Sequence, residues 1–228
     1  MNTKLLYMHD MHLLECEAHI VDIKTDEEKT IVILDQTVFY PQGGGQPADV
    51  GRIENETSIF RVEHARYIDG VVEHVGEFEI GSLSVGDKIT CYVNEEKRNL
   101  HTRLHSAGHL VDLALKKLNI DWTPGKGFHF LDGSYVEYEG TVEPDAKEGV
   151  MKSIENMCNE LIKENRTTSV AFDEGSTKNG KSMRTVYYGD FGIECGGTHV
   201  QQLSDIGEVG IRKIKCKKGV VRLSYMLK

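Results

Sequence analysis

The sequence has little of what anchors or exports a protein. No apolar run in its 228 residues approaches the roughly 20 residues that a membrane-spanning helix needs. The N-terminal stretch MNTKLLYMHDMHLLECEAHI has one lysine, scattered histidines and no small-residue cleavage site, so we interpret it as mature protein. The five cysteines are odd in number and widely spaced, which argues against a disulfide framework and predicts a reducing, cytoplasmic setting.

An excess of positive charge is also missing. The chain has 27 lysines and arginines against 36 acidic residues, for a formal net charge of −9. A protein that binds nucleic acid through its overall charge is usually basic, so any such contact here must use a local basic patch. The length is comfortable for two domains.

Residues 1–92 predict a small β-barrel. Short runs rich in valine, isoleucine, threonine and tyrosine follow one another without a helical pattern between them. Turn signals such as Asp69-Gly70 and Gly86-Asp87 separate several of these runs. The predicted strands are LLECEAHIVDI, KTIVILD, TVFY, SIFRVEHARY and KITCYV.

Residues 93–228 predict a second domain of the α+β class. Apolar residues three and four positions apart predict a one-sided helix over Glu95–Leu118, and a second helix is expected from about residue 144 to 164. A hairpin is expected between FHFL and SYVEYEG, with Asp132-Gly133 as its turn. MRTVYYG predicts one later strand, and a closing pair, GEVGIRKIKC and VVRLSYML, joins at Lys218-Gly219.

Histidines at helical spacing predict a metal site. His101, His105 and His109 lie four residues apart, and side chains at that spacing share one face of a helix. Far downstream, Cys195 and His199 bracket Gly-Gly-Thr, whose glycines let both side chains turn toward one point. Taken singly, the histidines fit a solvated surface and the Cys-Gly-Gly-Thr-His segment fits a glycine turn with a buried thiol. Together they favour a metal.

The small residues Ser106–Gly108 favour His105 and His109 as the helical ligands, because they let another segment approach the helix closely. His101 is then a neighbour. A ligand set of cysteine and histidine without a carboxylate favours zinc over magnesium or calcium. The segment lacks the His-Glu-x-x-His pattern of zinc proteases, since Ser106 follows His105.

Three motifs together resemble a known module. HSAGHL followed by CGGTHV resembles the editing domain of alanyl-tRNA synthetase, to which a threonyl-tRNA synthetase domain is related. FYPQGGGQPADVG at 39–51 resembles the glycine-rich stretch before that editing core, and GEVGIRKIKCKKGVVRLSY resembles its end. Without an aminoacylation domain, the chain resembles the free-standing AlaX family, in a longer type with a barrel domain.

The resemblance implies a trans-editing hydrolase that deacylates mischarged tRNA. The implied substrate is Ser-tRNA(Ala), with Gly-tRNA(Ala) as a further candidate, and the implied Zn²⁺ ligands are His105, His109, Cys195 and His199. Other functions stay open: a non-catalytic, zinc-stabilised tRNA-binding module, an unrelated zinc hydrolase of a small ester or amide, or editing of Ser-tRNA(Thr).

Further residues are candidates for substrate contacts, each with an alternative. Thr123 would bond the serine hydroxyl, or be a turn residue before proline. Backbone amides of Gly43, Gly44 and Gly45 would approach the substrate, or form only a tight turn. Lys126 and His129 would reach the tRNA end, or be exposed loop residues.

A basic cluster near the C-terminus is the candidate tRNA contact. Strand alternation places Lys213, Lys215 and Lys217 on one face. They fit phosphate binding, or a solvated edge strand on which lysines discourage aggregation.

Overall fold

The computed structural model describes residues 2–26, 29–178 and 181–228, which fall into two compact units. The first unit comprises Met1–Gly43, Pro47–Leu100 and Gly175–Ser182, and the second comprises Gly44–Gln46, His101–Glu174 and Met183–Lys228. These units interleave along the chain. The division into functional domains 1–92 and 93–228 stays a prediction.

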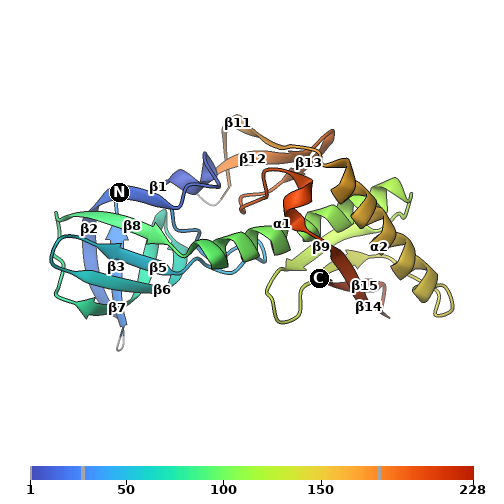
Figure 1. The fold of residues 1–228 in the computed structure, drawn as a ribbon, viewed down its shortest axis with the longest axis horizontal. Helices are drawn as coiled ribbons and strands as arrows, with labels where there is room; N and C mark the ends of the chain where they lie inside the picture. Colours follow the sequence, from blue (N-terminus) through green and yellow to red (C-terminus); the bar gives the residue numbers. More distant parts are fainter. Residues whose placement is uncertain (1, 27–28, 179–180) are drawn as a thin grey trace. The chain divides into compact units, whose positions relative to one another are not determined.

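The first unit contains a closed six-stranded barrel, which confirms the predicted small β-barrel (Figure 1). Its strands follow the order β2-β3-β7-β6-β5-β8, and every neighbouring pair is antiparallel. The bounds are β2 Glu15–Asp26, β3 Lys29–Leu34, β5 Gly51–Glu54, β6 Ile59–Ile68, β7 Val71–Ile80 and β8 Lys88–Val93.

Alternation explains the barrel interior. On β6 the side chains of Phe60 and Val62 are buried while those of Arg61 and Glu63 face solvent. The strand β7 was not predicted, because acidic residues and His74 interrupt its apolar pattern. His74 is nevertheless fully buried, with its two ring nitrogens bonded to Thr37 and Val32.

The predicted strand TVFY is wrong beyond its first residue. Only Gln36–Thr37 forms a strand, β4, which pairs in parallel with β1 at Lys4–Leu5. The backbone N–H of Tyr40 donates to the Asp49 carboxylate at 2.6 Å, and that of Phe39 donates to the Thr37 hydroxyl at 3.0 Å. Side chains thus take the donors that a sheet ladder would have used.

A buried ion pair anchors the start of α1, which spans Glu95–Lys117 as the sequence predicts. The Arg98 guanidinium donates from Nε to both carboxylate oxygens of Asp49 at 3.0 Å. Its other nitrogens donate to the carbonyls of Val38 and Met11 at 2.7 and 3.0 Å. Arg98 is only 1% exposed, so these acceptors replace the water that the charge has lost.

The second unit is α+β and contains a sheet in the order β14-β15-β10-β9. The closing pair β14 Val209–Lys217 and β15 Val220–Leu227 turns at Lys218 and Gly219, as predicted, with both residues at positive φ. The helix α2 packs on β14, where its Asn159 bonds to both backbone groups of Val209. α2 spans Lys147–Glu164, a later start than expected because residues 144–146 form a turn.

The predicted hairpin is present, but its first strand lies earlier in the chain. β9 is Thr123–Phe128 and pairs with β10, Tyr135–Glu139, through Phe128 and Tyr135. His129 leaves the ladder because its N–H donates to the carbonyl of Gly45 at 2.9 Å. β9 contains a proline and two glycines, which an edge strand tolerates.

The remaining strands form a sheet in the order β11-β12-β13. Their bounds are β11 Thr168–Lys178, β12 Lys181–Tyr188 and β13 Phe191–Glu194, so the expected single strand MRTVYYG is one of three. Within the part of the chain that the structure describes, neither α1 nor α2 is both long enough and apolar enough to cross a membrane.

Candidate metal centre

Four side chains from two distant segments converge in the second unit. His105 and His109 lie on successive turns of α1, and Cys195 and His199 follow β13. Their ligand atoms all lie within 4.8 Å of one another. The structure thus gathers the four residues that the sequence singled out into a group that could hold a metal ion. His101 is not in that group.

The spacing of the ligand atoms fits a tetrahedral ion. The Nε2 atoms of His105 and His109 are 3.2 Å apart. The Cys195 Sγ lies 3.5 Å from His105 Nε2 and 3.4 Å from His199 Nε2. Zinc–nitrogen and zinc–sulfur bonds of ordinary length in a regular tetrahedron place two nitrogens about 3.3 Å apart, and nitrogen and sulfur about 3.5 Å apart. The donor chemistry and these three distances therefore fit zinc, and the other pairs of ligand atoms lie within 4.8 Å of each other.

Each imidazole is oriented by a partner at its other nitrogen. His105 Nδ1 lies 2.7 Å from the Gln46 side-chain oxygen, and His109 Nδ1 lies 3.1 Å from an Asp112 carboxylate oxygen. His199 Nδ1 lies 2.9 Å from the Tyr188 hydroxyl, which donates its own proton to the Ser106 carbonyl at 3.4 Å. Each Nδ1–H is thus a donor, so each Nε2 faces the centre of the group and presents its lone pair there once it carries no proton.

Burial and neighbouring charge set the ionisation of the ligands. Burial lowers the pKa of His105 and His199 well below the ordinary histidine value, which keeps both imidazoles neutral. Burial alone would raise the pKa of the Cys195 thiol, but a hydrogen bond and charge from His109 lower it overall. Burial likewise acts to lower the pKa of His109, yet Asp112 and Cys195 raise it to about 10. Ligation requires His109 to release that proton.

Two glycines make room for the imidazole rings. A Cβ on Gly197 would lie 2.1 Å from His105 Cε1, and one on Gly108 would lie 2.4 Å from His129 Cε1. The small residues of α1 thus admit His129, whose ring stacks on that of His105 with centroids 4.6 Å apart. The expectation that a segment approaches the helix closely at this point is confirmed.

Gln46 and Thr198 join the two ligand-bearing segments and were not identified from the sequence. The Gln46 side-chain oxygen also accepts from the Thr198 N–H at 2.9 Å, and its Nε2 donates to the Thr198 hydroxyl at 2.9 Å. That hydroxyl lies 2.7 Å from Thr102 Oγ1 on α1. Arg184 holds the cysteine loop by donating to the carbonyls of Cys195 and Gly197.

The remaining predicted substrate residues occupy different environments. Thr123 and Lys126 are exposed on β9. His129 is buried, with Nδ1 2.6 Å from the Tyr225 hydroxyl, and burial together with the charge of His109 lowers its pKa to about 3. It is therefore a neutral packing partner of His105. The alternative of an exposed loop residue is wrong for His129.

The three glycines of the glycine-rich segment fall into different units. Gly44 and Gly45 belong to the second unit and have positive φ, whereas Gly43 belongs to the first. A Cβ on Gly45 would lie 2.3 Å from the carbonyl oxygen of Gly127, so this backbone packs tightly on β9. The role of these glycines in substrate binding stays a prediction.

The predicted tRNA contacts lie on the edge strand of the second unit. Lys213, Lys215 and Lys217 are all exposed on β14, with Ile214 buried between the first two. Strand alternation thus places the three ammonium groups on one face, as the sequence predicts. Arg222, the neighbour of Lys215 on β15, forms an ion pair with Glu137 at 2.6 Å.

Comparisons with known proteins find similar sequences along nearly the whole chain. A family profile described as "tRNA synthetases class II (A)" matches residues 4–97. The chain is 32% identical to the alanyl-tRNA editing protein AlaX-L of Pyrococcus horikoshii, over 96% of its own length and 57% of that protein. It is 30% identical to the alanine–tRNA ligases of Nitrosomonas europaea and Saccharolobus islandicus, over 90% and 98% of its own length. It spans 26% of each ligase.

Proposed function

Because the chain is a homologue of the AlaX family of alanyl-tRNA editing proteins, we propose that it hydrolyses mischarged tRNA in trans. The proposed substrate is Ser-tRNA(Ala), with Gly-tRNA(Ala) as a further candidate, and we expect the protein to act in the cytoplasm. The observation that carries the proposal is the cluster His105, His109, Cys195 and His199, in a chain that matches an editing protein along 96% of its length.

Zinc is the proposed metal. Three neutral nitrogen donors and one thiolate suit its preference, and the distances between these donors fit its bond lengths. Four protein ligands complete a tetrahedral site, which is the arrangement of zinc ions that organise structure. We therefore propose that the metal, held as a fixed positive charge, tethers the cysteine loop to α1. The residues around it would then position the ester.

Selection against serine is the chemical problem that such an enzyme solves. A synthetase pocket built for alanine rejects an added hydroxyl poorly, because the hydroxyl changes the binding free energy only modestly. An editing site can instead require that hydroxyl as a hydrogen-bond partner. Thr123 is the proposed partner, because it is exposed on β9, the strand that also carries Lys126.

Lys213, Lys215 and Lys217 are the proposed phosphate contacts. Their exposure on one edge strand supports a local basic surface in a chain of net charge −9. Phosphate binding through this surface would make the affinity for tRNA fall steeply with salt.

The decisive experiment is a panel of charged tRNAs. Ser-tRNA(Ala), Gly-tRNA(Ala), Ser-tRNA(Thr) and Ala-tRNA(Ala) are each incubated with protein, with and without added zinc, and deacylation is followed. We expect hydrolysis of Ser-tRNA(Ala) and sparing of Ala-tRNA(Ala). Equal rates on these two substrates refute the proposal, because such an enzyme would destroy the correct product.

A second candidate is a non-catalytic tRNA-binding module stabilised by zinc. The observation that favours it is the set of four protein ligands, which leaves no open coordination position in a tetrahedral site. This candidate predicts salt-sensitive binding of tRNA without deacylation of any member of the panel.

A third alternative is a zinc hydrolase of small esters or amides. If uncharged tRNA inhibits the deacylation by competition, this alternative is refuted.

A further inference from the structure

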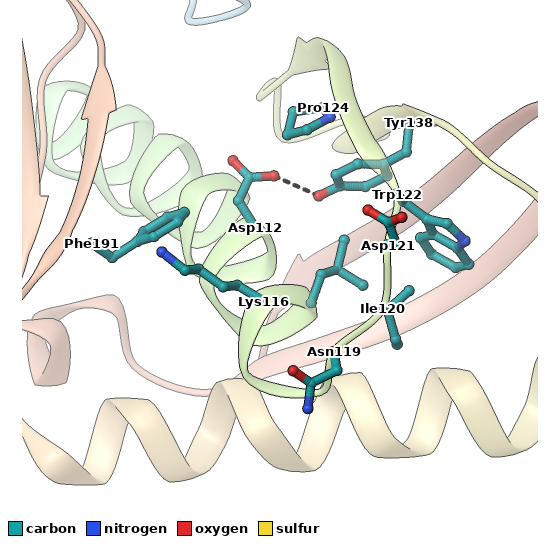
Figure 2. Close-up of a pocket in the computed structure, with 10 residues that line it drawn as sticks. Asp112, Lys116, Asn119, Ile120, Asp121, Trp122, Pro124, Tyr138 and Phe191 are labelled. Atoms are coloured by element: carbon teal, nitrogen blue, oxygen red, sulfur yellow. Dashed lines mark hydrogen bonds between the residues drawn. The ribbon is translucent and has the colours of Figure 1, made fainter.

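The second unit contains a pocket that is separate from the candidate metal centre. None of His105, His109, Cys195 and His199 lines it. It has a volume of about 480 Å³ and lies beside the C-terminal end of α1. This volume falls in the range of small-molecule sites and exceeds what the side chain of serine or alanine would fill. Figure 2 shows the pocket with its lining side chains.

Aromatic rings form two sides of this pocket. Figure 2 shows Phe191 and Lys116 on one side and Tyr138 and Trp122 on the other. The ring centroids of Trp122 and Tyr138 are 5.9 Å apart, and the Lys116 ammonium lies 5.2 Å from the centroid of Phe191. The flat face of an aromatic ring on either wall suits a planar ligand ring, which gains stacking energy from that face.

The polar groups of the pocket suit the edge of such a ring. Lys116, Asn119 and Asp121 are exposed and line the pocket, where they offer donors and acceptors. Two carboxylates, Asp112 and Asp121, outnumber the one lysine, which disfavours a phosphate group. The pocket chemistry therefore points to an uncharged heterocycle.

Asp112 lies between the pocket and the cluster of His105, His109, Cys195 and His199, because its carboxylate contacts one residue of each. One of its carboxylate oxygens accepts from the Tyr138 hydroxyl at 2.7 Å, inside the pocket. The other lies 3.1 Å from Nδ1 of the ligand His109. A group bound in the pocket is therefore close to the proposed site of ester cleavage.

We propose that this pocket binds a nucleobase, that of the 3′-terminal nucleotide of the tRNA, whose ribose carries the ester. The inference rests on the proposed function for the identity of the RNA, and on the aromatic walls, the volume and the Asp112 bridge for the site. Stacking against the Phe191 wall, with Trp122 and Tyr138 closing the opposite side, would hold the base while the aminoacyl ester extends toward the cluster.

The chain supplies its own reporter for this binding. Trp122 is the single tryptophan, so all tryptophan fluorescence arises in the pocket wall. The probe is a short single-stranded RNA ending in cytidine-cytidine-adenosine, titrated at fixed salt. The comparison probe has the same backbone with an abasic terminal nucleotide. We expect the first probe to quench Trp122 and the abasic probe to bind about fivefold more weakly or worse, with little quenching. Equal affinity and quenching by both probes overturn the inference.

A matched pair of substitutions tests the wall itself. Phe191→Leu keeps an apolar side chain but removes the aromatic face, so the probe Kd should rise roughly 5- to 150-fold. Phe172→Leu changes a phenylalanine that is 37% exposed on β11 and does not line the pocket, and its Kd should stay within about twofold of wild type. An unchanged Kd in Phe191→Leu, with unaltered circular dichroism, overturns the inference. If Phe191→Leu fails to fold, the abasic comparison on the wild-type protein still decides.

The test of the pocket and the test of the proposed function can fail independently of each other. Base-dependent quenching without deacylation of the tRNA panel keeps the pocket and refutes the hydrolase. Deacylation of Ser-tRNA(Ala) with equal binding of both probes keeps the hydrolase and refutes the pocket. When both hold, Phe191→Leu should raise KM for Ser-tRNA(Ala) by a larger factor than it lowers kcat.

Discussion

The interior of the barrel and the surroundings of the metal-ligand cluster are stabilised by different chemistry. The barrel encloses a continuous group of aliphatic and aromatic side chains, among them Val32, Phe60 and Ile89. The face of α1 in the second unit instead buries imidazoles and polar groups, including His105, Ser106 and Thr102. The first interior gains free energy from removing apolar surface from water. The second must satisfy every buried polar atom, and a bound metal ion would be the common partner of the imidazole nitrogens and the thiolate.

This difference predicts that the two units respond to different perturbations. Removing the metal should affect the second unit and spare the barrel. Breaking a buried charge pair should affect the barrel and leave the ligand set intact. Acid should act on both units, because it protonates a histidine buried in the barrel as well as the imidazole and thiolate ligands.

The largest effect should come from loss of the metal. Structural zinc in small domains is coupled to folding by about 10–16 kcal/mol at neutral pH, so Cys195→Ala should abolish stoichiometric zinc binding and expose the second unit. We expect metal analysis to find about one zinc per chain in the wild type, and hydrogen exchange to accelerate in α1 after residue 101 but not in β6 or β7.

Cys216→Ala is the matched control, because Cys216 lies on β14 outside the ligand group. It should retain zinc. Full zinc retention in Cys195→Ala and His109→Ala would contradict the ligand assignment, and equal loss of protection in the barrel would contradict the contrast between the units.

The next largest effect should follow from breaking the Arg98–Asp49 pair. Asp49→Ala leaves the Arg98 guanidinium buried without its carboxylate, which typically costs about 3–5 kcal/mol. Urea unfolding should shift by that amount while zinc content per folded chain stays unchanged.

Glu54→Ala is the matched control for the buried pair, because the Glu54 carboxylate pairs with Arg52 where solvent reaches both side chains. Its loss should change the free energy of unfolding by about 1 kcal/mol or less. A shift below about 1 kcal/mol in Asp49→Ala as well would indicate that water or another group compensates the Arg98 charge.

Acid should weaken the barrel through His74. Complete burial lowers the pKa of His74 to about 4, while an unfolded histidine titrates near 6.5. The unfolded state therefore binds the proton more readily, and stability is lost as the pH falls from about 6.5 toward 4, by up to about 3 kcal/mol. Urea unfolding monitored by exchange of barrel amides should show this loss, and His74→Gln should flatten the profile. An NMR titration that places the His74 pKa near the unperturbed value of about 6.5 would refute it.

The smallest effect should come from Thr123→Val, which keeps the shape and removes a hydroxyl. A neutral hydrogen bond contributes roughly 0.5–1.5 kcal/mol, so kcat/KM for Ser-tRNA(Ala) should fall about three- to thirtyfold once an unpaired partner is included. Zinc content and melting temperature should not change, because Thr123 is exposed and outside the ligand group. Undiminished hydrolysis of Ser-tRNA(Ala) would mean that the serine hydroxyl is recognised by another group, and Gly43 to Gly45 would be tested next.

The two regions also differ in how much of their structure could be predicted from the sequence. Alternation and helical periodicity identify most barrel strands, α1 and the closing hairpin, because these patterns are local. The four clustered residues were identifiable because two ligands lie four residues apart on a helix and two more bracket a glycine pair. β7 was missed because Glu73 and His74 are buried there against the usual preference of their residue types.

The partners that orient the ligands could not be predicted. Gln46 lies 59 residues from His105 and 152 from Thr198, and no local pattern records such contacts. Its position within the glycine-rich stretch FYPQGGGQPADVG was the one signal in the sequence. The Asp112 contact was easier to predict from the sequence, because Asp112 lies three residues after His109 on the same helix.

The position of Gln46 constrains how this architecture can be rearranged in a gene. Its codon lies among those that build the barrel, while its side chain bonds to His105 in the second unit. A recombination event that carried only residues 93–228 into another gene would leave the Nδ1 of His105 without its acceptor. A shorter descendant of this chain would need a substitute amide or carboxylate from elsewhere, whereas one that begins before residue 44 would inherit the original.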